Sequence, residues 1–468
     1  MLHNASEESL GQQRADTAIK ILMSEGEIRN TVAKVLLANK LSSSFDFVII
    51  TLAKKENVIK HAIPNNNVKL VSISDVVSDV ARPIGLDEME SLLEYNLEKI
   101  VFDDPDLSIT RKQEGSKAIT FFSEYVSAMK QIIDVEKVDF FLTMGEDRLY
   151  NMVPYLLLKK QNKRSWLLRS TPYFGFTATS DFMGPLSQLN KPFWTPTEME
   201  VNEYIARVVD GGAYGAPYAM SNKGNATNLR EVVSYYWECI NEIDNPYRWT
   251  RFFEAKNNLY RAMHRKLSRV KYSKIPTGNF IFFPLHYIDD AQVRLKAPMF
   301  YNQYALINNI ALCLPSAYSL VVKPHPHFDG GYDERELNGL SKNPKVCLIH
   351  PSVSSRAIIE KSKAIITINS TVGYESLLLR KPVYCLGTPF YANFGGVRRI
   401  NMTSLGLDLD LTDEALHAME EEIASQLTSN LQGLLGGSIR GGRLGGDYLS
   451  DENVSLLKEL IDKLVVAE

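Results

Sequence analysis

Hydrophobic and polar residues follow one another along the chain in two separate series of short apolar runs and longer amphipathic stretches. The first series predicts strands at 45–52, 68–73, 138–143 and 165–169, and helices at 17–41, 88–100, 116–133 and 149–160. The second series predicts strands at 279–283, 319–323, 345–349, 364–368 and 382–386, and helices at 298–314, 354–361 and 371–379. Because strands that alternate with helices form open, largely parallel sheets, the pattern predicts two doubly wound, Rossmann-type α/β domains.

The segments outside the two series set the expected domain limits. Residues 176–230 are irregular, 229–270 has a helical pattern broken at Asn245-Pro246, and the Gly-rich stretch 433–446 lacks phosphate-loop spacing, which favours a flexible loop. A last helix, 451–466, is expected to pack back on the body. The expected division is an amino-terminal α/β domain (1–228), a helical connection (229–275), a carboxy-terminal α/β domain (276–430), and a Gly-rich loop with the last helix (431–468).

Composition places the chain among ordinary soluble globular proteins. Of its 468 residues 45% are hydrophobic and 23% are charged, so each domain can bury a core. The formal net charge of −3 gives no reason to expect a nucleic acid as partner. The start of the chain lacks the apolar segment of a secretion signal, and no apolar run approaches the roughly 20 residues of a membrane span. We therefore expect a cytoplasmic protein, which can still touch a membrane surface.

The four cysteines give no sign of a disulfide framework or of a metal site. They are far apart, with no Cys-x-x-Cys pair and no His at metal-ligand spacing, and three of them lie in apolar surroundings. Buried free thiols in a reducing compartment are the expected state of Cys239, Cys313, Cys347 and Cys385. No cofactor and no metal are expected.

The first candidate for chemistry is Lys323-Pro324-His325-Pro326, directly after the predicted strand 319–323. In open parallel sheets, ligands bind beyond the carboxyl ends of the strands. Two prolines hold the turn rigid, so His325 points in a fixed direction, from which it can donate to a phosphate oxygen or protonate a leaving phosphate. Lys323 can add positive charge. The alternative is a turn whose His only caps a backbone carbonyl.

The second candidate is the segment from Asn369 to Glu375, which opens a helix directly after the strand 364–368. Small residues, Ser370, Thr371 and Gly373, leave the backbone N–H groups of the first turn open to an anion such as phosphate. Glu375, one turn further, can bind ribose hydroxyl groups. The alternative is a simple N-cap in which Glu375 completes a capping box.

The amino-terminal domain offers candidates for the catalytic carboxylate. Glu146 and Asp147 follow an apolar strand and a glycine, so they are expected at the carboxyl edge of a sheet, where they can act as base or nucleophile; the alternative is an N-cap pair for the next helix. Arg169 ends the following strand and can bind a carboxylate with both arms of its guanidinium group, or it is a surface residue.

A basic stretch precedes the second series of elements. It holds Lys256, Arg261, Arg265, Lys266, Arg269, Lys271 and Lys274 with no acidic residue between them, and Tyr260 and Leu267 interleave. This pattern indicates either a face that meets anionic lipid or the solvated face of a long helix.

The motifs of the second series resemble those of the capsule polysaccharide biosynthesis family, which includes bacterial Kdo transferases. The resemblance rests on KPHP, on NSTVGYESLLLRKPVYCLGTPFY about forty residues later, and on the upstream FFPLHYIDDAQVRLKAPMFYNQYALINNIALCLP, and it covers about 280–395. It implies a GT-B fold, with the two domains facing a cleft, a cytidine-monophosphate leaving group and an acidic sugar donor such as CMP-Kdo. It also implies that His325 binds phosphate and that Ser370 and Thr371 form the phosphate site.

The resemblance assigns roles to the two domains and is incomplete in one loop. The carboxy-terminal domain would bind the nucleotide-sugar, which is a substrate, and the amino-terminal domain would bind a saccharide or glycolipid acceptor, at the inner face of the cytoplasmic membrane if that acceptor is lipid-linked. Where the family often has Gln and Pro-Glu, this chain has His286 and Asp289-Asp290, near the donor, so the donor sugar is left open.

Two other functions compete with a capsule glycosyltransferase. A CDP-glycerol-type polyol-phosphate transferase also has a Lys-Pro-His-Pro-like turn, but usually an Asp-Tyr-Ser-Ser type motif where this chain has Asn369-Ser370-Thr371. A non-catalytic assembly factor of the same fold would not need to keep His325, Ser370 and Glu375, and all three are present.

Overall fold

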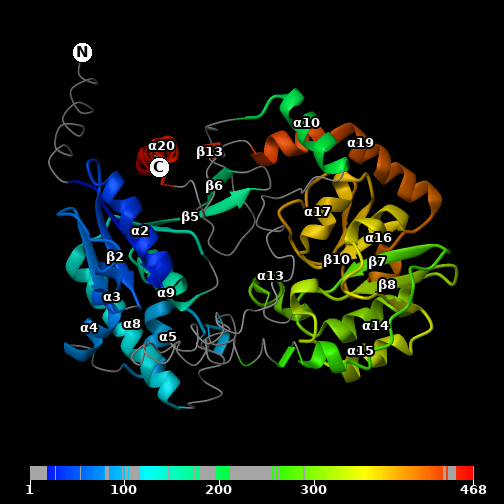
Figure 1. Cartoon of the computed structure of the whole chain (residues 1–468), viewed down its shortest axis with the longest axis horizontal. Helices are drawn as coiled ribbons and strands as arrows, with labels where there is room; N and C mark the ends of the chain where they lie inside the picture. The colour runs from blue at the N-terminus through cyan, green and yellow to red at the C-terminus, as the bar shows by residue number, and fades with distance from the viewer. Residues whose placement is uncertain are drawn as a thin grey trace.

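A computed structural model shows two α/β domains, each built on its own sheet (Figure 1). It describes residues 18–26, 28–52, 54–79, 84–96, 98–100, 104, 116–145, 148–171, 175–179, 195–210, 256, 260–261, 263–287, 290–435, 439–440 and 449–466.

The first sheet has the strand order β13-β6-β5-β4-β1-β2-β3. Its parallel strands are β1 (Lys20–Glu25), β2 (Asp46–Thr51), β3 (Val68–Ser72), β4 (Phe140–Thr143) and β5 (Arg164–Thr171), and its antiparallel strands are β6 (Gly175–Thr179) and β13 (Ile439–Arg440). One face is covered by α2 (Ile28–Leu41) and α20 (Asp451–Val466), and the other by α5 (Leu86–Leu93), α8 (Ser116–Glu136) and α9 (Leu149–Lys160). Two short helices, α3 (Lys55–Ile59) and α4 (Ile73–Asp79), flank β3.

The start of this domain differs from the prediction, which placed one helix over 17–41. The structure has β1, a break at Gly26, and then α2. Since β1 is buried on both faces of the sheet, its apolar residues form a continuous run that periodicity cannot distinguish from a helical segment. The helix expected at 88–100 is also divided, because α5 ends at Glu94, whose φ of 51° is left-handed.

The second sheet is entirely parallel, in the order β12-β11-β10-β7-β8-β9. Its strands are β7 (Phe280–Pro284), β8 (Ser319–Lys323), β9 (Val346–Leu348), β10 (Ala364–Thr367), β11 (Val383–Cys385) and β12 (Val397–Arg399). One face carries α14 (Gln303–Cys313), α15 (Glu334–Ser341) and α18 (Leu405–Asp408), and the other carries α16 (Ser355–Lys361) and α17 (Thr371–Leu378). Helix α19 (Asp413–Leu435) follows, and the helix expected at 298–314 is preceded by a separate 3₁₀ turn, η2 (Pro298–Phe300).

Both sheets have the doubly wound strand order 3-2-1-4-5 in chain terms, and the second adds a sixth parallel strand. The two domains lie side by side, so the architecture is the predicted α/β, GT-B-like one (Figure 1). In this topology the strand order reverses between β1 and β4 in the first sheet and between β7 and β10 in the second. Ligands of doubly wound sheets preferably bind at the carboxyl ends of the strands at this point of reversal.

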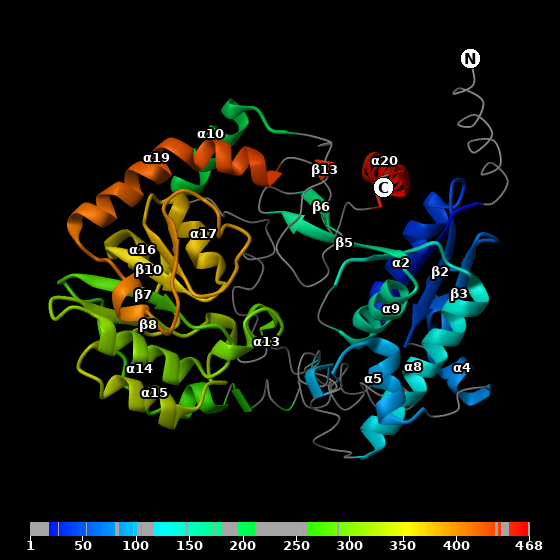
Figure 2. The same ribbon diagram turned by 180° about the vertical axis from the view of Figure 1, so that it is seen from behind.

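Each domain is completed by a helix that the sequence order would assign to the other domain. Helix α10 (Glu198–Val209) precedes the second domain in sequence but packs on α17 and α19, whereas α20 returns to α2 of the first domain (Figure 2). The last helix therefore packs back on the body, as predicted, with Leu460 and Ile461 fully buried. The expected domain limit at residue 228 lies outside the described residues.

Two expectations from composition are answered in the described part of the chain. No helix there is both long and apolar enough to cross a bilayer. Cys385 is buried as expected, Cys313 and Cys347 are free thiols but only half-buried, and Cys239 falls outside the described residues.

Candidate functional site

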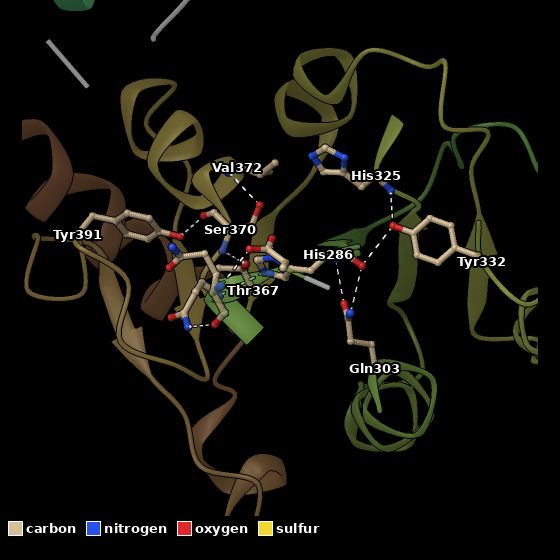
Figure 3. Close-up of polar contacts among 11 residues, drawn as sticks. His286, Gln303, His325, Tyr332, Thr367, Ser370, Val372 and Tyr391 are labelled. Atoms are coloured by element: carbon tan, nitrogen blue, oxygen red, sulfur yellow. Dashed lines mark hydrogen bonds and ion pairs between the residues drawn. The ribbon is translucent and has the colours of Figure 1, made fainter. Parts of the chain in front are cut away.

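The candidate site lies at the carboxyl edge of the second sheet, where β7 separates β8 from β10. The Lys-Pro-His-Pro turn follows β8, and the Asn-Ser-Thr segment follows β10, so the two predicted motifs are brought to one edge. Between them, Leu285 to Tyr287 follow β7. Figure 3 shows this edge, with His325 beside the start of α17 and His286 between the two motifs.

His286 joins the loop after β7 to the loop after β10. Its side chain is only 4% exposed, its Nδ1 lies 2.8 Å from Asp290 Oδ2, and its Nε2 accepts from the backbone N–H of Asn369 at 3.4 Å. A backbone N–H can only donate, so the ring hydrogen is on Nδ1 and is donated to Asp290. Gln303 bonds both the N–H and the carbonyl of His286. The predicted donor-binding role of His286 therefore becomes one of positioning, because both ring nitrogens are occupied inside the protein.

Ser370 is the N-cap of α17. Its Oγ accepts from Val372 N–H at 3.2 Å, and its own N–H donates to Thr367 Oγ1 at 3.0 Å. With Ser370 as N-cap, the third helical residue is Gly373, so Glu375 is too far along the helix to complete the capping box that the sequence suggested. Thr371 is exposed, and neither its side chain nor its N–H makes a hydrogen bond to a residue that the structure describes. Its N–H and hydroxyl group are therefore the donors that this first turn offers to an anion.

Two predicted ligands in this segment also make contacts within the protein. Asn369 is 4% exposed, and its Nδ2 donates to the carbonyl of Gln292 at 2.8 Å. Gly373 is buried, and a Cβ there would lie 2.2 Å from the hydroxyl oxygen of Tyr391, which donates to the carbonyl of Ser370. Gly373 is required because this buried tyrosine crosses the start of the helix.

His325 is held through its backbone. Its N–H donates to Tyr332 Oη at 2.9 Å, and Tyr332 in turn donates to the carbonyl of His286 at 3.2 Å. The carbonyl of His325 accepts from Phe328 N–H within the 3₁₀ turn η3 (Pro326–Phe328). The half-buried imidazole packs edge-on against Tyr287, with ring centroids 5.7 Å apart, and is left at the edge of the sheet.

Lys323 and Glu375 form a pair of ionisable groups behind the motifs. Lys323 is 5% exposed and donates from Nζ to Ser355 Oγ at 3.2 Å. Burial lowers the pKa of Lys323 to about 8, against the attraction of Glu375, and burial raises the pKa of Glu375 to about 7, against the attraction of Lys323. Two groups displaced toward neutrality by burial at a sheet edge are typical of a binding or catalytic site.

A groove of about 840 Å³ lies beside this edge, beyond β11 and β12. Gly387 links it to the motifs, because a Cβ there would lie 2.3 Å from Asn369 Oδ1. Asn302 and Asn401 each direct the side-chain oxygen to a backbone N–H, of Ala305 and Thr403, which leaves their NH₂ groups as donors. The lining combines amides, cations and an aromatic ring: Lys296, Phe300, Asn302, Arg399 and Asn401.

The first domain carries polar side chains at the ends of β1 and β4, among them Glu25, which the sequence prediction missed. Glu25 ends β1, is 8% exposed, and pairs with Lys34 at 2.9 Å; Lys34 also donates to the carbonyl of Ser24. Thr143, at the end of the neighbouring β4, donates to Asn151 at 2.8 Å. The signal was present in the sequence, since Ser24-Glu25-Gly26 follows an apolar run as Gly145 and Glu146 do, but the segment was assigned to a helix.

The remaining predicted residues lie wholly or partly outside the described part of the chain. Glu146 and Asp147 lie outside the described residues, as does Asp289 of the loop after β7. Arg169 lies in β5 opposite Thr177, and its side chain is outside the described part. Among the described residues, no group of three or more His, Cys, Asp or Glu side chains is arranged to hold a metal ion.

Comparison with known proteins finds relatives of parts of this chain. The chain is 29% identical over 161 residues to protein FixF of Sinorhizobium fredii, covering 32% of this chain and 39% of FixF. It is 30% identical over 118 residues to the capsule polysaccharide modification protein LipA of Neisseria meningitidis serogroup A, covering 25% of this chain and 16% of LipA. The chain thus spans less than half the length of the curated relatives that it matches.

Among solved structures, the β-Kdo 2,7 transferase of KpsC from Thermosulfurimonas dismutans aligns over 95% of this chain and 99% of its own, with 13% identity and a TM-score of 0.33. A UDP-GlcNAc 2-epimerase from Neisseria meningitidis, bound to UDP-GlcNAc, aligns over 96% and 100%, with 11% identity and a TM-score of 0.25. The family model described as capsule polysaccharide biosynthesis protein matches residues 225–418, which include both motifs of the candidate site. The segment 225–418 is therefore similar to the capsule polysaccharide biosynthesis family.

Proposed function

We propose that this protein is a glycosyltransferase that moves an acidic sugar, such as Kdo, from a CMP-activated donor to a surface or capsular polysaccharide or its lipid-linked acceptor. The supporting observation is that three features lie at one edge of the second sheet. They are the exposed start of α17 at Thr371, the imidazole of His325, and the Lys323–Glu375 pair. The match of residues 225–418 to the capsule polysaccharide biosynthesis family supports the part of the proposal that concerns capsule polysaccharide.

The proposed donor lies with its phosphate at the start of α17. The N–H and hydroxyl group of Thr371 bind phosphate oxygens, and the dipole of the helix favours the negative charge. Breaking the bond between the sugar and its phosphate oxygen leaves that electron pair on the nucleotide. His325 and Lys323 stabilise the new charge, the first by donation or proton transfer and the second as a nearby cation. In this proposal no metal is needed for leaving-group departure.

Glu375 serves the ribose in this proposal. With its pKa raised to about 7, the carboxyl group is held between the charged and neutral forms at neutral pH, and in either form it accepts a hydrogen bond from a ribose hydroxyl group. The groove between Phe300 and Arg399 is the proposed place for the sugar or the acceptor, because amide and guanidinium donors suit a hydroxyl-rich, carboxylate-bearing ligand.

The acceptor hydroxyl group attacks from the side of the first domain, and a carboxylate there takes its proton or forms the glycosyl intermediate. Glu146 and Asp147 remain the proposed carboxylates, with Arg169 for the acidic sugar. Glu25 is less suited, because Lys34 already binds its carboxylate in a site that is closed to solvent. A lipid-linked acceptor would place the reaction at the inner face of the cytoplasmic membrane.

The test offers the purified protein CMP-Kdo, CMP, CDP-glycerol and UDP-sugars, and measures thermal stabilisation and release of free nucleotide. We expect CMP to raise the melting temperature and CMP-Kdo to release CMP once an acceptor is present. Turnover of CDP-glycerol would support the polyol-phosphate alternative. Stabilisation by UDP but not by CMP would overturn the cytidine assignment, and binding without turnover of any donor would favour a non-catalytic assembly factor.

A further inference from the structure

One surface outside the candidate site combines exposed apolar side chains with positive charge. Residues 260, 261 and 263–267 are helical, and the chain then runs without a further helix to β7. Three large side chains of this helix lie in solvent: Tyr260 is 56% exposed, Met263 55% and Leu267 71%. Single exposed apolar residues are ordinary, but three on one helix need an explanation.

The helix is attached to the second domain by the opposite face. The guanidinium carbon of Arg261 lies 4.1 Å from the centre of the Phe328 ring, in the turn that follows His325. Gly330, with φ of 79°, brings its backbone against the carbonyl oxygen of Arg261, where a Cβ would lie at 2.4 Å. At about 100° per residue, the three exposed apolar residues fall within about 60° of one another, on the side away from Arg261. The apolar stripe therefore points outward while the helix is fixed.

The charge around this stripe is positive. Five exposed cations, none of which makes an ion pair with a described residue, follow or interleave with the stripe: Arg265, Lys266, Arg269, Lys271 and Lys274. No acidic residue occurs between positions 256 and 274. Asp329 and Glu334 act on Tyr272, whose pKa is raised to about 12 mainly by burial. The stretch from Lys256 to Lys274 itself carries positive charge and no acid.

We propose that the surface formed by Tyr260, Met263, Leu267 and these five cations, the docking face, binds an anionic lipid membrane. The apolar tips enter the boundary between headgroups and acyl chains, and the cations attract lipid phosphates; together these features define an interfacial helix. A nucleic acid would use the cations but not the aliphatic tips. Only the purpose of this membrane contact rests on the proposed function: it would bring the sheet edge of the candidate site near a lipid-linked acceptor.

The test measures co-sedimentation of the full chain with vesicles of phosphatidylcholine, alone or mixed with phosphatidylglycerol, across a salt series. We expect binding to the mixed vesicles that falls with salt and is weak on phosphatidylcholine alone. Lys266→Gln with Arg269→Gln should weaken binding about fivefold for each cation removed. Met263→Ser with Leu267→Ser should weaken vesicle binding about tenfold or more, since burying each aliphatic side chain in the membrane contributes at least as much free energy as one cation.

Matched controls come from other exposed residues of the same domain. Leu312 and Leu407 are 82% and 88% exposed, and Lys342 and Lys361 are exposed lysines, all outside the docking face. Their changes to Ser or Gln should leave vesicle binding unaltered. Absence of binding to anionic vesicles, or equal losses in docking-face and control variants, overturns the inference. Thermal stabilisation by CMP is measured in parallel. A protein that binds CMP but not anionic vesicles would contradict the docking-face inference while leaving the proposed function intact.

Discussion

Replacing Lys323 by Met should make the protein more stable and bind nucleotide less well. Lys323 is 5% exposed, and its pKa is lowered from 10.5 to about 8, chiefly by burial. Since each tenfold change in proton affinity corresponds to about 1.4 kcal/mol, charging this lysine in the folded protein costs about 3 kcal/mol at neutral pH. A methionine of similar length fills the same space without a charge.

The expected gain is smaller than the full cost. The change removes the hydrogen bond to Ser355, which contributes about 1 kcal/mol, and it removes the attraction between Lys323 and Glu375. We expect a net stabilisation of about 1–2 kcal/mol, which raises the melting temperature of a domain of this size by about 2–8 °C. Affinity for CMP should fall by about tenfold to a hundredfold, the usual effect of losing a charge-assisted contact.

The pH dependence of the difference gives a second check. The folded pKa of Lys323 is below the unfolded one, so its unfavourable contribution is complete below about pH 8 and disappears as the pH rises toward 10.5. The melting-temperature difference between wild type and Lys323→Met should therefore be largest near pH 7 and shrink toward pH 10. Glu375 behaves oppositely: its pKa is raised from 4.5 to about 7, so its favourable contribution is present at acid pH and is lost as the pH rises through 7.

Thermal unfolding with and without CMP, at pH 7 and pH 10, measures both effects. Lys342→Met, at an exposed lysine of the same domain, serves as control and should change neither stability nor binding. If Lys323→Met lowers stability at pH 7, the lysine is a structural residue and the reasoning from burial is wrong. If CMP stabilises both proteins equally, Lys323 is not part of the nucleotide site.

Three further changes test the remaining parts of the site. His325→Ala should reduce turnover by about 10²–10⁴-fold, measured as nucleotide release, with an unchanged melting curve; full activity would remove this histidine from the mechanism. Gly373→Ala should lower the free energy of unfolding by about 1–3 kcal/mol in urea titrations, and adding Tyr391→Phe should recover only part of it, because a ring carbon remains 2.7 Å from the new Cβ. His286→Phe should cost about 2–4 kcal/mol, because it leaves the backbone N–H of Asn369 and one carboxylate oxygen of Asp290 without partners, and it should also weaken CMP binding; an unaltered CMP affinity would argue against its positioning role.

Local sequence features were sufficient for elements whose boundaries have their own signals. The range of β8 was predicted correctly, since Pro324 directly follows its apolar run, and the ranges of α9 and α20 were also correct. The β1 strand was missed because its apolar residues continue into those of α2, with Gly26 as the break between them. A strand that is buried on both faces loses the alternation by which strands are recognised.

The site could be predicted as a place but not as a set of contacts. Both motifs follow parallel strands, and parallel strands of one sheet end at one edge, so their proximity followed from the pattern. The roles of Asn369 and Gly373 could not be predicted, because they depend on Gly387 and Tyr391, which are about twenty residues away in sequence. A small residue before a helix looks the same whether it admits a ligand or a buried tyrosine.

The exchange of helices between the domains bears on how the site works. Helix α10 is joined to α17 through the hydroxyl groups of Tyr204 and Tyr374, 3.0 Å apart, and its last carbonyls, including that of Val208 at 2.8 Å, accept from Arg356 of α16. The helix that carries Thr371 at its start is thus supported from behind by α10, which precedes the second domain in sequence. Because packed helices shift as units, a displacement of α10 would reach the first turn of α17. The proposed phosphate site therefore depends on α10 as well as on its own sheet.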